Sequence, residues 1–247
     1  MEGIQGVIDI HSHILPGIDD GARDWNMSCE MLDIAWKQGI RKIIATPHFM
    51  PGGKNSDVSV IREAAEKLQS YADRKSYDMQ IYTGNEIYYH DEVPELLEAG
   101  RILTMADSSY VLVEFAPLDD YRYIRNSLAK LQAEGYSPII AHVERYESVC
   151  KKPFDRIKEL REMGVMIQVN ASTIERKMGW KLQMMMISML KKQLIDLIGT
   201  DAHSSGGRSP RIEKCCDIIR KKCSEKYANK LLYRNAEKYI LQDNPLI

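Results

Sequence analysis

Short apolar runs that alternate with longer stretches of helical periodicity constrain the fold of this chain more than any other feature. Each run is only a few residues long, rich in Val and Ile, and apolar at most positions. Strands that are buried on both faces of a parallel sheet have this pattern. We expect seven such strands, at Gly6–His11, Lys42–Thr46, Gln80–Glu86, Tyr110–Phe115, Pro138–His142, Val165–Asn170 and Leu194–Thr200.

The stretches between these runs predict helices. In one of them, Val58, Ile61, Ala65 and Leu68 recur at spacings of three and four, as an amphipathic helix requires. Helices are expected at about Asp24–Gln38, Val58–Asp73, Glu92–Glu98, Tyr121–Glu134, Phe154–Met163 and Leu182–Lys192, with two more between Pro210 and Gln242. Successive β-then-α units predict a single α/β domain over residues 1–247, closed as a TIM-like barrel. Because a standard barrel has eight strands, a ring of seven is expected to be distorted or incomplete.

Composition and charge exclude several classes of partner. The formal net charge of −1 gives no sign of a nucleic-acid or acidic-membrane partner. The sequence has no run near the ~20 apolar residues that a membrane span needs, and no signal peptide. Its cysteines are odd in number, five, and scattered. Reduced thiols in a cytoplasm are therefore expected.

Histidines and acids fall where the predicted strands end. Five of the six histidines follow or end a strand, and His90 is the exception. Glu86, Glu114, Asp201 and Asp20 lie at the same level. The carboxyl ends of barrel strands converge on one mouth, so these distant residues are expected to be neighbours. Imidazole and carboxylate together suit Zn, Mn or Fe. The pattern predicts a site for two or three ions, built from His11, His13, Asp20, His48, Glu86, Glu114, His142, Asp201 and His203.

The order of these motifs resembles that of a known family. DIHSH, ATPHF, GNEIYY, AHVERY and GTDAHS, read along the chain, resemble the polymerase-and-histidinol-phosphatase (PHP) superfamily. The segments HSHILPGIDDGA and AHVERY are similar to its bacterial manganese-dependent protein-tyrosine phosphatase branch, which belongs to capsule and exopolysaccharide operons. The resemblance extends from Asp9 to about Pro210. It implies a distorted (β/α)7 barrel with a trinuclear metal site.

The resemblance also implies a ligand set for each ion. One ion would be held by His11, His13, Glu86 and Asp201, and a second by Glu86, Glu114 and His142. Asp20, His48 and His203 would hold the third, so Asp20 rather than Asp19 is expected to touch metal. Manganese is expected, with Fe, Zn or Mg as alternatives.

The implied reaction is hydrolysis of phosphotyrosine, in the cytoplasm, on the tyrosine-rich tail of a bacterial autokinase that controls polysaccharide export. A metal-activated water would attack phosphorus. Arg145 and Arg208 would clamp the phosphate with guanidinium forks. The alternatives are a histidinol-phosphatase-like small-molecule phosphoesterase and a metal-stabilised binding module. No oligomeric state is predicted.

Four other features leave choices open. The segment from Cys150 to Arg156 matches the Cys-x5-Arg pattern of thiol phosphatases, but it has no glycine and contains Pro153. Asp9 would either orient a ligand histidine or cap its strand. Asn170 is expected at the mouth as a polar wall residue. The cluster Met184, Met185, Met186 and Met189 is expected to pack against the barrel or a partner rather than bind metal.

Overall fold

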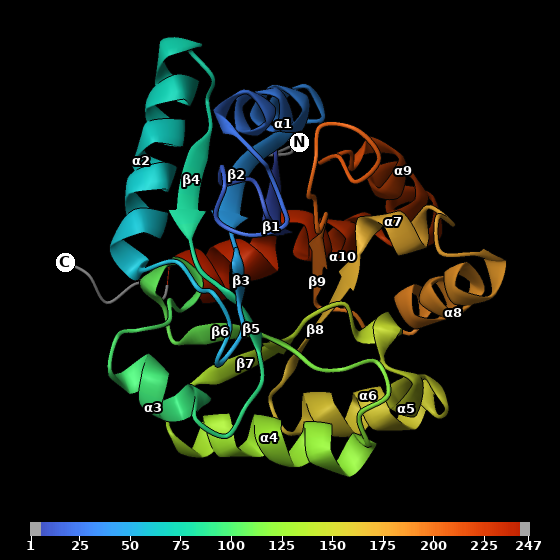
Figure 1. Ribbon diagram of the computed structural model, residues 1–247. Helices are drawn as coiled ribbons and strands as arrows, with labels where there is room; N and C mark the ends of the chain where they lie inside the picture. The colour runs from blue at the N-terminus through green and yellow to red at the C-terminus, as the bar shows by residue number, and fades with distance from the viewer. Residues whose placement is uncertain (1–5, 243–247) are drawn as a thin grey trace.

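Parallel strands curl around one axis and helices surround them in the computed structural model, which describes residues 6–242 (Figure 1). The strands are β1 (Val7–Ser12), β2 (Ile40–Ala45), β3 (His48–Phe49), β4 (Gln80–Thr83), β5 (Glu86–Tyr88), β6 (Tyr110–Glu114), β7 (Ser137–Ile140), β8 (Met166–Asn170) and β9 (Leu197–Gly199). Their carboxyl ends form the mouth of a TIM-like barrel, as predicted.

The ring is distorted because its second and third strands are broken. One sheet has the order β1-β2-β4 and the other the order β3-β5-β6-β7-β8-β9, and all their pairs are parallel. The prediction of one strand over Gln80–Glu86 is wrong, and β3 was not predicted. Each break lies at a residue that interrupts strand geometry: Pro47 has no N–H to donate, and Gly84 lacks a side chain to pack. The Asn85 side chain donates to the carbonyl oxygen of Pro47 at 2.9 Å and holds the two breaks together.

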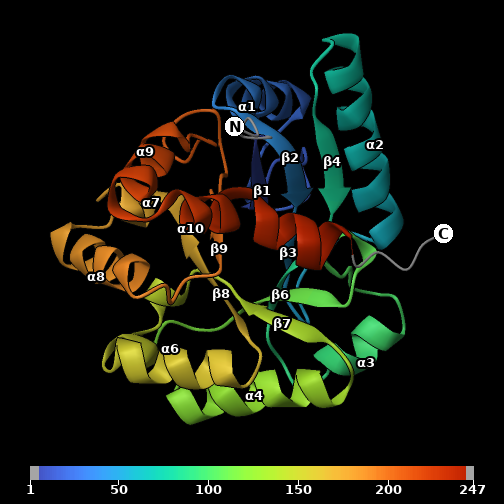
Figure 2. The ribbon, with the colours of Figure 1, turned by 180° about the vertical axis from the view of Figure 1, so that it is seen from behind.

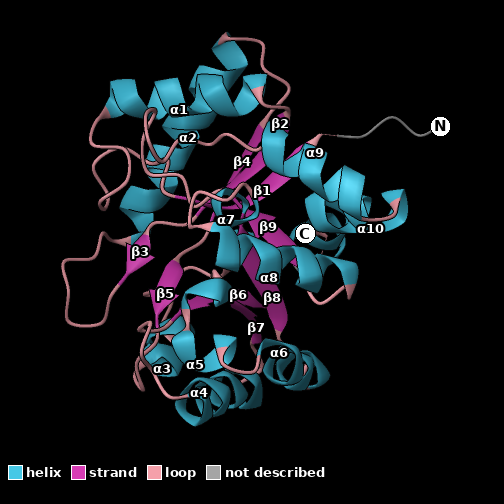
Figure 3. Ribbon diagram, turned by 90° about the vertical axis from the view of Figure 1, so that its right-hand side faces the viewer, coloured by secondary structure: helices cyan, strands magenta, loops and turns pink. Residues whose placement is uncertain are grey.

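The helices form the outer layer, which Figure 3 shows from the side. They are α1 (Trp25–Lys37), α2 (Val58–Arg74), α3 (Val93–Glu98), α4 (Tyr121–Ala133), α5 (Glu147–Cys150), α6 (Pro153–Glu162), α7 (Ala171–Ile174), α8 (Trp180–Lys191), α9 (Glu213–Lys222) and α10 (Glu225–Asn229). The predicted helices are present, but α5 and α7 were missed because four residues are too few to show a period. Within residues 6–242, no helix is long and apolar enough to cross a membrane.

Two apolar cores hold these layers together. The larger fills the space between the barrel and the helices. The smaller lies inside the barrel and includes Ile8, Ile10, Leu112 and Ile139. The last helical segment, which continues from α10 through wide π-helical turns to Leu241, adds Ala236 and Ile240 to this inner core. Figure 2 shows that segment crossing the barrel on the side away from the mouth, where it forms the floor.

Candidate metal centre

A buried set of four side chains lies at the centre of the mouth. The Nε2 atoms of His11 and His13 lie 3.1 and 3.2 Å from Oε2 of Glu86, and 3.7 and 3.5 Å from Oδ1 of Asp201. One potential ligand atom from each residue lies within 4.8 Å of the others, and all four residues are buried. These residues, here called the inner set, are the ones that the family resemblance assigned to one ion.

Glu86 connects the inner set to its neighbours. Its Oε1 lies 2.6 Å from Nε2 of His142, and its Oε2 lies 3.0 Å from Nδ1 of His48. Glu114 faces the same two imidazoles, at 3.4 Å from His142 and 3.7 Å from His48. The structure therefore surrounds Glu86 and Glu114 with His48 as well as the expected His142. The two oxygens of Glu86 face different histidines, which is the arrangement of a carboxylate able to bridge two ions.

A third set lies at the edge of the mouth. Asp20 Oδ1 lies 3.5 Å from Nε2 of His48 and 3.4 Å from Nε2 of His203. His13 is also within 4.8 Å of these three residues. The Asp20 side chain is 67 % exposed, whereas those of the inner set are at most 4 % exposed. We call Asp20, His48 and His203 the rim set, because they lie where the mouth is open to solvent.

The residues of the mouth fit a group of divalent cations. Glu86 Oε2 is a buried carboxylate oxygen with no hydrogen-bond partner among the described residues, although three imidazole nitrogens approach it. Leaving such an atom unpaired costs ~1–3 kcal/mol or more, and a bound cation would remove that cost. Mixed imidazole and carboxylate donors are the ligands that Mn, Fe and Zn accept.

Burial lowers the pKa of three of the five imidazoles at the mouth and so favours the neutral form that metal binding requires, whereas hydrogen bonds to Asp19 and Glu86 outweigh burial and raise the pKa of His13 to about 10. Burial lowers the pKa of His203 to about 4, and the pKa of His142 and of His48 is also below its usual value for this reason. Burial and the charge of Glu86 raise the pKa of Glu114 to about 7. Burial would raise the pKa of Asp201 as well, but the charges of His11 and Arg145 hold it well below its usual range.

Asp19 supports the mouth from behind, a role that the sequence did not reveal. Its Oδ2 accepts a hydrogen bond from Nδ1 of His13 at 2.7 Å and one from the backbone N–H of His48 at 2.9 Å. A Cβ on Gly21 would overlap the carbonyl oxygen of His13, so only glycine lets this loop approach so closely. The contact fixes Nδ1–H on the outer side of the ring and turns Nε2 of His13 toward the inner set. The only signal in the sequence was a second aspartate beside Asp20.

Gln168, on β8, is a second support that sequence reasoning missed. Its Oε1 accepts the backbone N–H of His142 at 2.6 Å and lies 3.3 Å from Nδ1 of His11. Its amide donates to Asn170 at 2.9 Å, and Asn170 donates to Asp201 at 2.8 Å. Asn170 is thus more than a wall residue, because it orients a carboxylate of the inner set. One polar residue inside a buried apolar run gives too little contrast to be noticed.

Left-handed backbone occurs at two residues of the mouth. His142 has φ 27° and Asp201 has φ 52°, a region that residues other than glycine rarely adopt. The backbone N–H of Asp201 donates to the carbonyl oxygen of His11 at 2.8 Å, and that of His142 is held by Gln168. Such conformations cost of order 1–3 kcal/mol each and persist only where neighbours enforce them.

The two arginines singled out from the sequence both reach the mouth. Arg145 lies in the single turn Val143–Arg145, and its Nη2 donates to Oδ2 of Asp201. Nη2 of Arg208 donates to the other oxygen of Asp201, Oδ1, at 3.0 Å. Their side chains are 35 and 48 % exposed. The guanidinium groups therefore lie between the inner set and solvent.

Asp9 supports the backbone. It accepts hydrogen bonds from the N–H and hydroxyl of Thr200 at 2.8 and 2.5 Å, and from the N–H of His11 at 3.4 Å. The ring of His11 contacts Gln168 instead. Asp9 thus joins β1 to the end of β9 and does not orient an imidazole. Its burial raises its pKa to about 6.

The thiol alternative is inconsistent with the structure. Cys150 lies in α5 with Sγ 3.4 Å from the carbonyl oxygen of Glu144, and burial raises its pKa to about 11. The Arg156 guanidinium lies over the ring of Tyr121 at 4.7 Å. Proline begins α6 between them. A nucleophilic cysteine needs a lowered pKa, and Cys150 has the reverse.

The barrel and the His, Asp and Glu residues at its mouth define a PHP-type fold with a candidate metal centre. A family model described as capsular polysaccharide synthesis, CpsB/CapC, matches residues 7–241, and the chain belongs to this family. It is 33% identical over 240 residues to the tyrosine-protein phosphatase CpsB of Streptococcus pneumoniae, covering 95% of this chain and 98% of that protein. Identity to the tyrosine-protein phosphatase YwqE of Bacillus subtilis is also 33%, over 232 residues, with coverage of 94% and 90%.

A solved structure supports the same assignment. It belongs to work on YwqE from Bacillus subtilis and CpsB from Streptococcus pneumoniae, described as unique metal-dependent tyrosine phosphatases. The two folds superpose with a TM-score of 0.86 at 30% sequence identity, covering 97% of this chain and 96% of the other. The resemblance seen in the sequence motifs is therefore confirmed at the level of family and fold.

Proposed function

We propose that this chain is a metal-dependent protein-tyrosine phosphatase. The observation that carries the proposal is the convergence of nine histidine, aspartate and glutamate side chains on one mouth, around a buried oxygen of Glu86 that has no hydrogen-bond partner among the described residues. The relatives named above are tyrosine-protein phosphatases, which favours this reaction over a histidinol-phosphatase-like one.

The proposed ligands fall into three sets, which follow the family resemblance. The inner set would hold one ion; Glu86, Glu114 and His142, with His48 beside them, would hold a second; and the rim set would hold a third. Manganese is our first choice, with Fe, Zn or Mg as alternatives. Bound ions of this kind supply a water of lowered pKa that can attack phosphorus, and they neutralise phosphoryl oxygens.

The protein's own groups would bind and orient the phosphate. Arg145 and Arg208 present guanidinium groups that match phosphate oxygens in a way that lysine cannot. Because both lie between the inner set and solvent, a phosphoryl group entering past the rim set would meet them before it reached Glu86. Asp19 and Gln168 would keep the imidazoles pointing at the mouth while this happens.

The proposed substrate is phosphotyrosine on a protein, namely the tyrosine-rich tail of a bacterial autokinase that acts in polysaccharide export. Membership of a capsular polysaccharide synthesis family supports this choice. The exposed rim also supports it, because a tyrosine side chain on a flexible tail can reach an open mouth. A cytoplasmic location accompanies this proposal.

Hydrolysis of a phosphotyrosine peptide after chelation and re-addition of single metals tests the proposal. We expect chelation to abolish activity, manganese to restore it, and histidinol phosphate to be a poor substrate. His11→Ala should be inactive, whereas His90→Ala, which changes an exposed histidine outside all three sets, should match wild type. Full activity of a metal-free sample, or of His11→Ala, would refute the proposal.

A further inference from the structure

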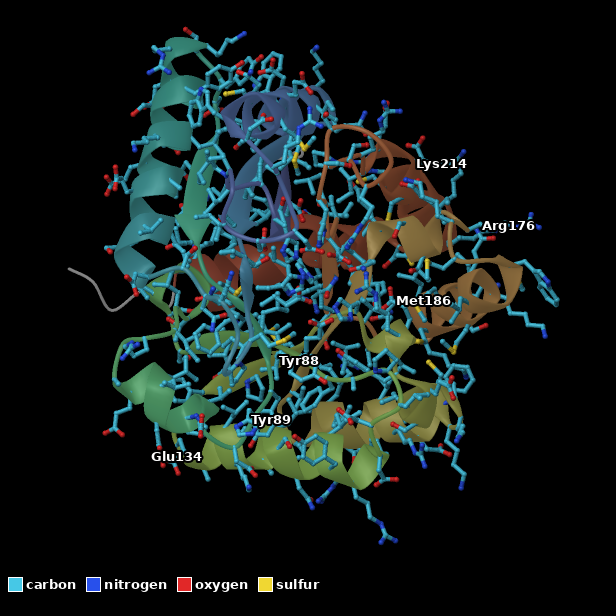
Figure 4. The ribbon with its side chains drawn as sticks, viewed as in Figure 1. Tyr88, Tyr89, Glu134, Arg176, Met186 and Lys214 are labelled. Atoms are coloured by element: carbon cyan, nitrogen blue, oxygen red, sulfur yellow. The ribbon has the colours of Figure 1, made fainter. Side chains whose placement is uncertain are left out.

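The turn between α7 and α8 projects from the molecule with every side chain exposed. It comprises residues 176–181, with the sequence RKMGWK, and we call it the α7–α8 turn. Met178 is 55 % exposed and Trp180 is 58 % exposed, and cations flank both. Figure 4 shows Arg176 at the outer edge of the molecule, pointing away from the barrel. Exposing a group of large apolar side chains to water is unfavourable, and such a group often marks an interaction site.

Packing of the protein does not account for these apolar residues. The inner face of α8, which contacts α7 and α9, is already formed by the buried residues Met186, Ile187, Met189 and Leu190. Met184 lies one turn after Trp180 on the outer face and is 55 % exposed. The methionine cluster was expected to pack against the barrel or a partner; Met186 and Met189 are buried in the larger apolar core, whereas Met184 is exposed.

The charge of the turn and of α8 is positive, although the carboxylate of Glu175, directly before the turn, lies 3.5 Å from Nζ of Lys177. Residues 176–192 contain five lysines and arginines and no aspartate or glutamate. The whole chain has a net charge of −1, so its average charge hides this local excess. Screening at physiological salt limits interactions to ~8 Å, so a surface in contact with the turn would respond to the local charge.

We propose that the α7–α8 turn docks this protein on an anionic lipid surface. Tryptophan is favoured at the headgroup level, methionine can enter the acyl boundary, and flanking lysine and arginine attract anionic headgroups. A peptide partner fits less well, because peptides are recognised in grooves and sheet edges, whereas this element projects. The association is peripheral and needs no helix that crosses the membrane.

Docking at this turn would place the mouth beside the lipid surface. The short helix α7 begins directly after Asn170, whose amide contacts Asp201. Arg176 follows Asn170 by six positions in the sequence, so the turn lies within ~20 Å of the mouth. The inference concerns only where the protein resides and does not depend on the proposed reaction.

Vesicle co-sedimentation of the full chain tests the proposal, together with tryptophan fluorescence. We expect binding to mixed phosphatidylcholine–phosphatidylglycerol vesicles, with a blue shift from Trp180 and loss of binding at high salt, and no binding to phosphatidylcholine alone. Trp180→Ser should weaken binding at least tenfold, because it removes the side chain that enters the headgroup level. The double variant Lys177→Glu/Lys181→Glu should also weaken binding at least tenfold, because each cation near an anionic surface contributes about fivefold. Trp25→Ser and Lys37→Glu/Lys54→Glu, which change exposed residues elsewhere, should bind as wild type does.

Two results would overturn this inference. One is a wild-type protein that fails to sediment with the anionic vesicles, and the other is unchanged binding by both turn variants. An increase in KM for a phosphotyrosine peptide in the turn variants, without vesicles and without loss of vesicle binding, would assign the turn to a peptide instead. Circular dichroism of each variant confirms that the fold is retained.

Discussion

The floor of the barrel and the inner set at its mouth are both buried but are opposite in chemistry. At the floor, Ile8, Ile10, Ala236 and Ile240 are at most 2 % exposed and purely apolar. At the mouth, the side chains of the inner set are at most 4 % exposed, yet each is ionisable. Burial at the floor stabilises the fold by ~25 cal/mol per Å² of apolar surface. Burial at the mouth costs free energy unless the groups are paired, so polar contacts and not apolar packing hold the side chains of the inner set in place.

The comparison leads to separate expectations for function and stability. Changes at the mouth should reduce activity and metal content with little loss of stability, because they remove ionisable groups whose burial costs free energy. Changes at the floor should reduce stability and leave catalysis intact.

Glu86→Gln should have the largest effect on activity. Its two oxygens face His11, His13, His48 and His142, so an amide in its place would disrupt two of the proposed metal positions. We expect kcat/KM on a phosphotyrosine peptide to fall by at least ~10³-fold. Metal analysis should show fewer ions per chain, while the metal-free protein should melt no lower than wild type. The exposed Glu98→Gln is the control, and wild-type metal content in Glu86→Gln would contradict the role assigned to this carboxylate.

Asp19→Ala should come next, through the orientation of His13. Losing the 2.7 Å hydrogen bond to Nδ1 frees the ring, and we expect metal affinity to fall by ~10–100-fold. Asp19→Asn keeps an acceptor and should lie between Ala and wild type. Isothermal titration with manganese measures the effect. Asp20→Ala serves as the neighbouring comparison and should lose only the weakest-bound ion. If Asp19→Ala and Asp20→Ala had the same titration curve, Asp19 would have no separate orienting role.

Arg145→Lys and Arg208→Lys should have moderate effects. Lysine keeps the charge but not the fork, so we expect kcat/KM to fall by ~10-fold or more for Arg145, and by less for the more exposed Arg208. Inhibition by inorganic phosphate should weaken in the same order. Metal content should stay at the wild-type level in both variants. An unchanged phosphate inhibition constant would argue against the clamp.

Ile240→Ala should leave activity unchanged and reduce stability. The residue is fully buried in the floor, and its truncation should lower the free energy of unfolding by ~2–5 kcal/mol. Urea denaturation of the metal-free protein measures this, and kcat on a phosphotyrosine peptide should match wild type. Tyr239→Ala changes the adjacent, partly exposed residue and should cost less. A large loss of kcat in Ile240→Ala would mean that the floor and the mouth are coupled.

Most of the fold was predictable because buried parallel strands leave a strong signal. The seven apolar runs identified the barrel, and the positions where they end identified its mouth. The breaks at Pro47 and Gly84 were not predicted. Whether such a residue divides a strand depends on how the neighbouring strands pair on each side of it, and the sequence of one strand does not show that pairing. The short helices α5 and α7 depend on contacts with neighbouring elements and not on a pattern of their own: α5 contacts α6 and the turn Val143–Arg145, and α7 contacts α8, α9 and β8.

Some residues of the candidate site could likewise be predicted from the sequence, and others could not. Histidine is rare in this chain, so five histidines at strand ends were conspicuous. Asp19 and Gln168 were not, because aspartate is common in turns and one glutamine does not alter an apolar run. Their roles emerge only when His13 and His142 are placed beside them in space.

The sequence by itself determined which chemical groups this protein brings to the end of each strand, because the strand pattern and the residue types are local properties. The tertiary structure decided which atoms face one another. It placed both oxygens of Glu86 among four imidazoles, put Asp19 behind His13 and left Asp20 at the open rim. The physical reason is that metal-binding geometry depends on distances of a few ångströms between residues far apart in the chain, and only closure of the barrel sets those distances.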